Sequence, residues 1–300
     1  MKVDLKTKKA KVIHEKRNKK TRRNKSMVKT KIIKELKCEF CGKGLRQEVN
    51  TWVVGGKEIC IKRIPERCDC KQAKEYWKEQ DEFERIKLLT KLEIERKKNM
   101  ERLYTLSSMS SRLRNYSFEN YKVCNENKTA YFKAKKYVAD LLEGKKSNSL
   151  FITGNIGTGK THLAASIANE LIKNGQPVIF GTLINLLTEV KDSYSIDGKY
   201  ESKIINKYSK IGLLIIDDLG KERPSEWTLE KLFTIINNRY ENNLPVIITT
   251  NYNREKLRER LACNKNYEIA DSIISRLYEM CKGINITGKD KRKDKRKELL

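Results

Sequence analysis

From residue 148 onward, short apolar runs alternate with longer stretches in which apolar residues recur every three or four positions. The runs predict strands, which we place at 150–153, 177–180, 211–218, 244–251 and 283–287. The longer stretches predict helices, among them 183–191, 254–261 and 269–281. This alternation is typical of an α/β domain whose parallel five-stranded sheet carries helices on both faces. We therefore expect functional side chains at the carboxyl ends of the strands.

The N-terminal part of the chain has a different pattern. Residues 49–54 and 57–61 read as the two strands of a hairpin with a Gly-Gly turn between them, and residues 71–113 read as a charged helix with a narrow apolar stripe. Changes in composition divide the chain into a basic tail at 1–37, a cysteine-rich module at 38–70, a helical linker at 71–113, the α/β domain at 114–288 and a basic C-terminal tail at 289–300.

One motif predicts what the α/β domain binds. Residues 154–161 read Gly-Asn-Ile-Gly-Thr-Gly-Lys-Thr, between a predicted strand and a predicted helix. The backbone N–H groups of such a loop and the positive end of the helix dipole bind phosphate. Lys160 would reach the β- and γ-phosphates, and Thr161 would ligate Mg²⁺. The sequence therefore predicts binding of ATP with Mg²⁺, and the candidate nucleotide contacts are Gly154, Asn155, Ile156, Gly157, Thr158, Gly159, Lys160, Thr161 and His162.

Polar residues at the ends of two other predicted strands supply the candidate catalytic groups. Asp217 and Asp218 follow a buried aliphatic run, as in a Walker B element, where the first carboxylate holds Mg²⁺ and the second orients or deprotonates the attacking water. Asn251 ends a neighbouring strand, where its amide could hold the water or sense the γ-phosphate. Thr250 is the alternative for that role, and Asn251 could instead cap the helix at 254–261.

Five of the eight cysteines lie within residues 38–70. Cys38 and Cys41 form one close pair and Cys68 and Cys70 another, on either side of the hairpin. Two such pairs can supply the tetrahedral thiolate set of a structural Zn²⁺ site, and a module this short needs such a staple to fold. We interpret Cys60 as a buried strand residue rather than a ligand.

The formal net charge of +27 indicates a polyanionic partner such as nucleic acid, although biased genome composition can account for part of the lysine excess. The tail at 1–37 is either a solvated tail or a phosphate-contact surface. No apolar run approaches the roughly 18 residues that span a membrane, and the N-terminus lacks the apolar core of a secretory signal. We therefore expect a cytoplasmic protein with no membrane partner.

The motifs together resemble the DnaC/DnaI-type helicase loaders of the AAA+ superfamily. The resemblance is carried by residues 149–165, 213–220, 247–251 and 273–281, by the segment 111–120 that leads into the nucleotide site, and by the Cys-x-x-Cys and Cys-x-Cys pairs. It implies an AAA+ fold with the Asp217 strand near the centre of the sheet and a zinc module before it. It also implies an ATPase that loads a hexameric replicative helicase onto single-stranded DNA at the initiation of replication.

The resemblance also implies roles for individual residues. Asn251 would be the sensor I residue, and Arg276, which the pattern alone leaves open as a surface ion-pair partner, would be an arginine finger that completes the site of an adjacent subunit. Self-association through the ATP sites follows from that role. Lys191 and Tyr194 are candidates for contact with single-stranded DNA.

Two departures from the family pattern qualify these expectations. Asp218 stands where AAA+ ATPases commonly have Glu, which predicts slow hydrolysis, stimulated by DNA or a partner. The chain after Cys281 is too short for the usual C-terminal helical lid. Two other functions are compatible with the pattern: an IstB-type ATPase that assists a DNA transposase, and a non-enzymatic nucleic-acid-binding zinc protein whose nucleotide site only stabilises the fold.

Overall fold

The computed structural model describes residues 29–54, 57–62, 66–145, 148–192, 199–221, 223–264 and 266–290. The chain divides into two compact units, residues 1–93 and 94–300, and the boundary falls within helix α2 (Lys71–Leu106). Each unit is described by itself below. Most of the predicted basic tail and Tyr194 lie outside the described residues.

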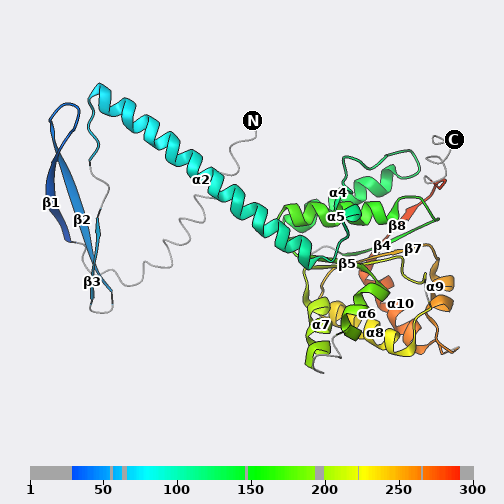
Figure 1. The fold of residues 1–300 in the computed structure, drawn as a ribbon. Helices are drawn as coiled ribbons and strands as arrows, with labels where there is room; N and C mark the ends of the chain where they lie inside the picture. Colours follow the sequence, from blue (N-terminus) through cyan, green and yellow to red (C-terminus); the bar gives the residue numbers. More distant parts are fainter. Residues whose placement is uncertain are drawn as a thin grey trace. The chain divides into compact units, whose positions relative to one another are not determined.

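The first unit contains a three-stranded antiparallel sheet in the order β1-β2-β3 (Figure 1). Its strands are β1 (Lys29–Lys37), β2 (Gly44–Val54) and β3 (Lys57–Lys62). The prediction that the basic tail extends to residue 37 is therefore wrong, because Lys29–Lys37 pairs with β2 along its length. Lysine-rich sequence is common at sheet edges, since pairing uses the main chain and the charges prevent further association. The predicted hairpin is confirmed by the pairing of Val49–Val54 with Lys57–Lys62.

The second unit contains the predicted parallel sheet of five strands, in the order β5-β6-β7-β4-β8. The strands are β4 (Ser149–Gly154), β5 (Val178–Thr182), β6 (Leu213–Asp217), β7 (Val246–Thr250) and β8 (Cys281–Ile286). Strand β6, which ends at Asp217, lies beside the central strand β7, as the resemblance implied. Because all five strands are parallel, their carboxyl ends meet at one edge of the sheet.

Helices cover both faces of this sheet (Figure 1). Those of the second unit are α3 (Ser111–Arg114), α4 (Lys128–Leu142), α5 (Lys160–Lys173), α6 (Leu183–Asp192), α7 (Lys199–Lys210), α8 (Glu226–Glu241), α9 (Arg254–Leu261) and α10 (Glu268–Met280). Alternate strand residues face opposite sides: Ile215 and Ile247 pack with side chains of α4 and α5, whereas Leu214 and Ile248 pack with those of α6, α8 and α10. The sheet is thus buried on both faces.

Candidate functional site

The phosphate-binding loop joins β4 to α5, as predicted. Gly154, Gly157 and Gly159 all have positive φ angles, of 150°, 78° and 98°. A side chain at Gly154 would clash with the carbonyl oxygen of Ile286, which would lie 2.2 Å from its Cβ. The buried Lys160 ammonium donates to the carbonyl oxygens of Gly154 and Asn155 at 2.9 and 2.8 Å. The sequence thus places a cation at a glycine-rich loop of the kind that binds phosphate.

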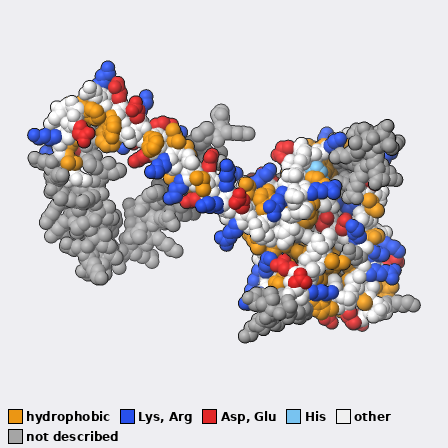
Figure 2. Space-filling model, in the orientation of Figure 1, with side chains coloured by type: hydrophobic (Ala, Val, Ile, Leu, Met, Phe, Trp, Pro, Cys, Tyr) orange, Lys and Arg blue, Asp and Glu red, His pale blue; other side chains and the backbone are white. Residues whose placement is uncertain are grey.

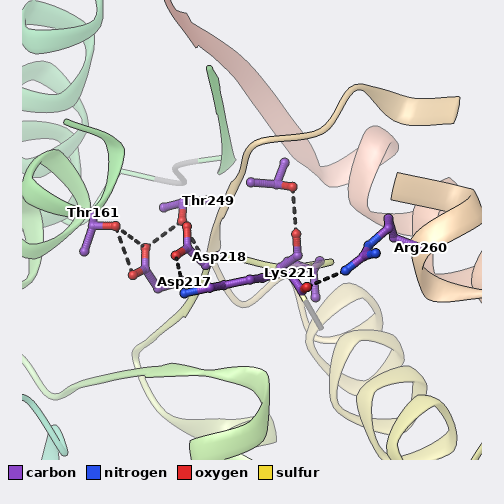
Figure 3. A network of polar contacts seen from close by, with 8 residues as sticks. Thr161, Asp217, Asp218, Lys221, Thr249 and Arg260 are labelled. Atoms are coloured by element: carbon purple, nitrogen blue, oxygen red, sulfur yellow. Dashed lines mark hydrogen bonds and ion pairs between the residues drawn. The ribbon is translucent and has the colours of Figure 1, made fainter. Parts of the chain in front are cut away.

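The carboxylate of Asp217 lies at the start of α5, within reach of two hydroxyl groups (Figure 3). Thr161 Oγ1 donates to both carboxylate oxygens at 3.0 Å, and Thr249 Oγ1 donates to Oδ1 at 2.6 Å. Burial raises the pKa of Asp217, and these hydroxyls and the charge of Lys160 oppose that rise. A carboxylate and a threonine hydroxyl are oxygen donors of the kind that Mg²⁺ prefers, so Asp217 and Thr161 fit the predicted metal pair.

Asp218 has a left-handed backbone conformation, with φ 54°. Its N–H donates to Thr249 Oγ1 at 2.9 Å, and its Oδ2 lies 3.8 Å from Lys221 Nζ. The side chain remains 27% exposed, so water can reach it. Thr249 therefore connects the two acids: it donates to the first and accepts from the backbone of the second. Thr249 carries no functional signal in the sequence, because a threonine inside a strand is an ordinary β-former.

The structure separates the alternatives at the end of β7. Asn253, not Asn251, caps α9 by accepting the Lys256 N–H at 3.0 Å. The Thr250 hydroxyl is fully buried and donates to the Leu219 carbonyl oxygen at 2.7 Å. The Asn251 amide is half-buried and makes no hydrogen bond within the part of the chain described here. Its predicted sensor role stays a prediction.

The Arg276 guanidinium contacts only α8 and α10 among the described residues. Nε donates to Asn237 Oδ1 at 2.7 Å and Nη1 to the Ser272 carbonyl oxygen at 3.1 Å, and the group lies 4.8 Å from the centre of the Phe233 ring. Within one chain, Arg276 is therefore not brought to the phosphate-binding loop. Its predicted finger role requires a second copy of the chain.

A segment just before the core packs beside the phosphate-binding loop. The His162 ring stacks on Tyr116 with centroids 4.2 Å apart, and its Nε2 lies 2.8 Å from Asn120 Oδ1. Asn169 donates to the Leu113 and Tyr116 carbonyl oxygens at 2.8 and 2.6 Å. The His162 side chain thus anchors the segment that leads into the site. Lys191, the described candidate for DNA contact, lies 5.2 Å from the centre of the Trp227 ring.

The four cysteines predicted to bind zinc come together in the first unit. Their sulfur atoms all lie within 4.8 Å of one another, with Cys41 and Cys68 at 3.4 Å and Cys38 and Cys70 at 4.0 Å. Tetrahedral Zn–S bonds of about 2.3 Å place sulfur atoms about 3.8 Å apart, so the cluster fits a structural zinc site. The N–H of Phe40 lowers the pKa of Cys38 to about 7, which favours its thiolate. Cys60 lies in β3, and its side chain is outside the described part.

None of the helices described here is both long enough and apolar enough to span a membrane.

Comparison with known proteins agrees with the geometry. Residues 77–299 match the family described as IstB-like ATP binding protein. The chain is 33% identical over 163 residues to the replicative helicase loader DnaC of Escherichia coli (strain K12), which covers 54% of this chain and 66% of DnaC. It is 29% identical over 195 residues to the phage-like element PBSX protein XkdC of Bacillus subtilis (strain 168), covering 61% of this chain and 68% of XkdC.

Two solved structures have a similar fold. The crystal structure of DnaI has a TM-score of 0.50 and 27% identity, over 62% of this chain and 95% of DnaI. The crystal structure of the DnaC helicase loader also has a TM-score of 0.50 and 27% identity, over 59% of this chain and 99% of that one. The chain spans just under two thirds of the length of the full DnaC relative. The match to residues 77–299, together with the phosphate-binding loop and its paired acids, shows that the chain belongs to the family of IstB-like ATP binding proteins.

Proposed function

We propose that the protein is an ATP-dependent loader that places a hexameric replicative helicase onto single-stranded DNA at the initiation of replication, in the cytoplasm. The observation that carries this proposal is the likeness to the replicative helicase loader DnaC, which holds both in sequence and in fold. The four-cysteine cluster ahead of the ATPase core adds support, because it matches the module that the resemblance to helicase loaders implies.

The arrangement of the site supports slow, Mg²⁺-dependent ATP hydrolysis. Lys160 and the loop N–H groups would bind the phosphates, and Thr161 and Asp217 would hold Mg²⁺, which would neutralise phosphate charge. Asp218, exposed to water at the same edge of the sheet, orients the attacking water. The Asn251 amide, which has no hydrogen-bond partner among the described residues, binds that water or the γ-phosphate. A neighbouring copy supplies Arg276, so hydrolysis requires self-association.

The first unit is proposed to bind Zn²⁺ and to grip the helicase. Its four sulfur atoms suit zinc, which would fix the start of α2 against the sheet through Cys68 and Cys70. On the part of α2 in this unit, Phe83, Ile86, Leu89 and Leu92 are each more than half exposed. Figure 2 shows hydrophobic side chains among charged ones along this helix. Apolar side chains exposed on a charged helix are candidate contacts for a protein partner. A hexameric helicase is the partner to which this surface is assigned.

The alternative function is an IstB-type ATPase that assists a transposase on duplex DNA. The family description, IstB-like ATP binding protein, favours this alternative. The likeness to the loader DnaC and the cysteine cluster favour the loader. The third interpretation, a zinc protein without turnover, would be excluded if ATP is hydrolysed and Lys160→Ala abolishes hydrolysis.

The testing experiment is size-exclusion chromatography with light scattering on the full chain mixed with the replicative helicase of the same organism. It is run with and without ATP and a single-stranded oligonucleotide, and Lys160→Ala serves as the control. A complex of defined stoichiometry that takes up the oligonucleotide only with ATP and the wild-type loop is expected. No complex under any nucleotide condition, together with a preference for duplex DNA, would support the transposase helper instead.

A further inference from the structure

The loop that follows β6 has an unfavourable backbone conformation. Asp218 has φ 54° and Gly220 has φ 85°. A residue other than glycine is uncommon in the left-handed region, and such a conformation persists only where surrounding contacts determine it. The conformation of Asp218 directs its carboxylate, so whatever holds the loop also determines where the second acid of the site lies.

One set of contacts comes from β7 (Figure 3). The Asp218 N–H donates to Thr249 Oγ1 at 2.9 Å, and the Leu219 N–H donates to the Thr249 carbonyl oxygen at 2.8 Å. The Thr250 hydroxyl donates to the Leu219 carbonyl oxygen at 2.7 Å. These bonds fix the first two residues of the loop. Within the described part of the sheet, no group binds the next two carbonyl oxygens, those of Gly220 and Lys221.

Those two carbonyl groups are bound by Arg260 of α9. Its Nε donates to the Gly220 carbonyl oxygen at 2.8 Å, and its Nη2 donates to the Lys221 carbonyl oxygen. One planar guanidinium thus binds two successive carbonyls, which fixes the peptide plane between them. The loop also lies close to α9, because a Cβ at Gly220 would be 2.6 Å from Leu257 Cδ1. The guanidinium contact also fixes the backbone of Lys221, whose side chain reaches toward the Asp218 carboxylate, with Nζ 3.8 Å from it.

We propose that Arg260 is a positioning residue for ATP hydrolysis: by holding the Gly220 and Lys221 carbonyls, it keeps Asp218 in its left-handed conformation with its carboxylate directed at the attacking water. This inference rests on the proposed ATPase activity. Arg260 has no contact with the phosphate-binding loop among the described residues. Its loss therefore slows the chemical step and leaves nucleotide binding unchanged.

A matched control lies two residues earlier on the same helix. Arg258 has an equally charged side chain, and it pairs through both Nε and Nη2 with the carboxylate of Asp271 on α10. It makes no contact with the loop after β6 in the described structure. Arg258→Ala and Arg260→Ala therefore each remove one two-pronged arginine contact from α9, but only the second frees the loop.

The experiment measures kcat for ATP, the Kd of a fluorescent ATP analogue and the Tm for the wild type, Arg260→Ala, Arg260→Lys, Arg258→Ala, Asp218→Ala and the double variant Asp218→Ala/Arg260→Ala. We expect Arg260→Ala to lower kcat by about ten- to a hundredfold with the Kd within about twofold, as a misplaced catalytic group does. Arg260→Lys, which keeps one donor, should recover part of that loss. The double variant should be no slower than Asp218→Ala alone, because Arg260 acts through Asp218.

The inference would be overturned if Arg260→Ala lowers kcat no more than Arg258→Ala does. It would also be overturned if, in the double variant, the fall in kcat caused by Arg260→Ala adds in full to the fall caused by Asp218→Ala. A Kd that weakens in parallel with kcat would also overturn it. These results differ from failure of the proposed function: a wild-type chain that binds the analogue but hydrolyses no ATP, alone or with helicase and DNA, would exclude the ATPase itself and the role of Arg260 with it.

Discussion

In residues 94–300 both faces of the sheet are covered by buried aliphatic side chains, whereas in residues 1–93 the buried side chains among those described are Cys38, Cys68 and Ala73. The ATPase core therefore gains its stability in the ordinary way, by removing apolar surface from water. The described part of the first unit has no comparable core. With zinc bound at the cysteine cluster as proposed, we expect the two units to depend on different stabilising interactions.

Because of this difference, the two units should lose stability under different conditions. If the first unit binds zinc as proposed, it should respond to chelators, which remove the metal, and to oxidation and acid, which remove the thiolate ligands. A unit held by apolar burial responds to none of these directly. Each of the following tests compares the two units.

The largest effect is expected from removal of zinc. Structural zinc contributes about 10–16 kcal/mol to small zinc-binding peptides, so chelation or Cys41→Ser should unfold the first unit. The second unit should keep its thermal transition and its ATP binding. Thermal unfolding monitored by circular dichroism, in which each unit gives its own transition, checks this. Zinc content is measured on the same samples. Cys124→Ser is the control, since Cys124 is exposed and lies outside the cluster. Loss of both transitions on chelation would contradict the comparison.

A cavity created by substitution in the second unit should give the next largest effect. Leu163 is fully buried in α5, so Leu163→Ala should destabilise this unit by about 2–5 kcal/mol. Leu142→Ala, at a leucine that is 37% exposed, should cost much less. Urea denaturation of both variants measures the difference. Zinc retention should be the same in both, and a loss of zinc from Leu163→Ala would show that the units do not depend on separate interactions.

The sequence predicts the second unit better than the first, for a physical reason. Buried parallel strands and the phosphate-binding loop are local patterns, so all five strands are predicted within a few residues. Strand β1 is missed because its lysine-rich sequence lacks the apolar pattern of a strand, although it pairs through its main chain with the next strand, β2. The same holds at the site: Asp217 and Lys160 belong to motifs, whereas Thr249 and Arg260 matter only through contacts formed by folding.

A smaller effect, opposite in sign, is expected at Asp217. Because burial raises the pKa of this carboxyl group, its charged form destabilises the nucleotide-free fold at neutral pH. Asp217→Asn removes that charge, so its Tm without Mg²⁺ and ATP should exceed that of the wild type. A raised carboxyl pKa means that the folded state takes up the proton more readily, so the advantage should shrink as the pH falls through that pKa. Scanning calorimetry between pH 3 and 8, a range that includes the usual aspartate pKa of about 4, measures it. An advantage independent of pH would contradict the assignment to this charge.

The smallest effect is expected from the ion pair between Arg67 and Asp81 in the first unit. Its two hydrogen bonds, at 2.5 and 2.7 Å, have good geometry, but the side chains are 41% and 53% exposed. Exposed pairs contribute about 0–1 kcal/mol, so Asp81→Asn should barely shift the melting of the zinc-loaded unit. If zinc dominates this unit, the shift should stay within that range and decrease further in high salt, since salt screens exposed charges. A shift of several kcal/mol would mean that the polar surface around Trp77, over which Arg67 lies, stabilises the unit more than its metal does.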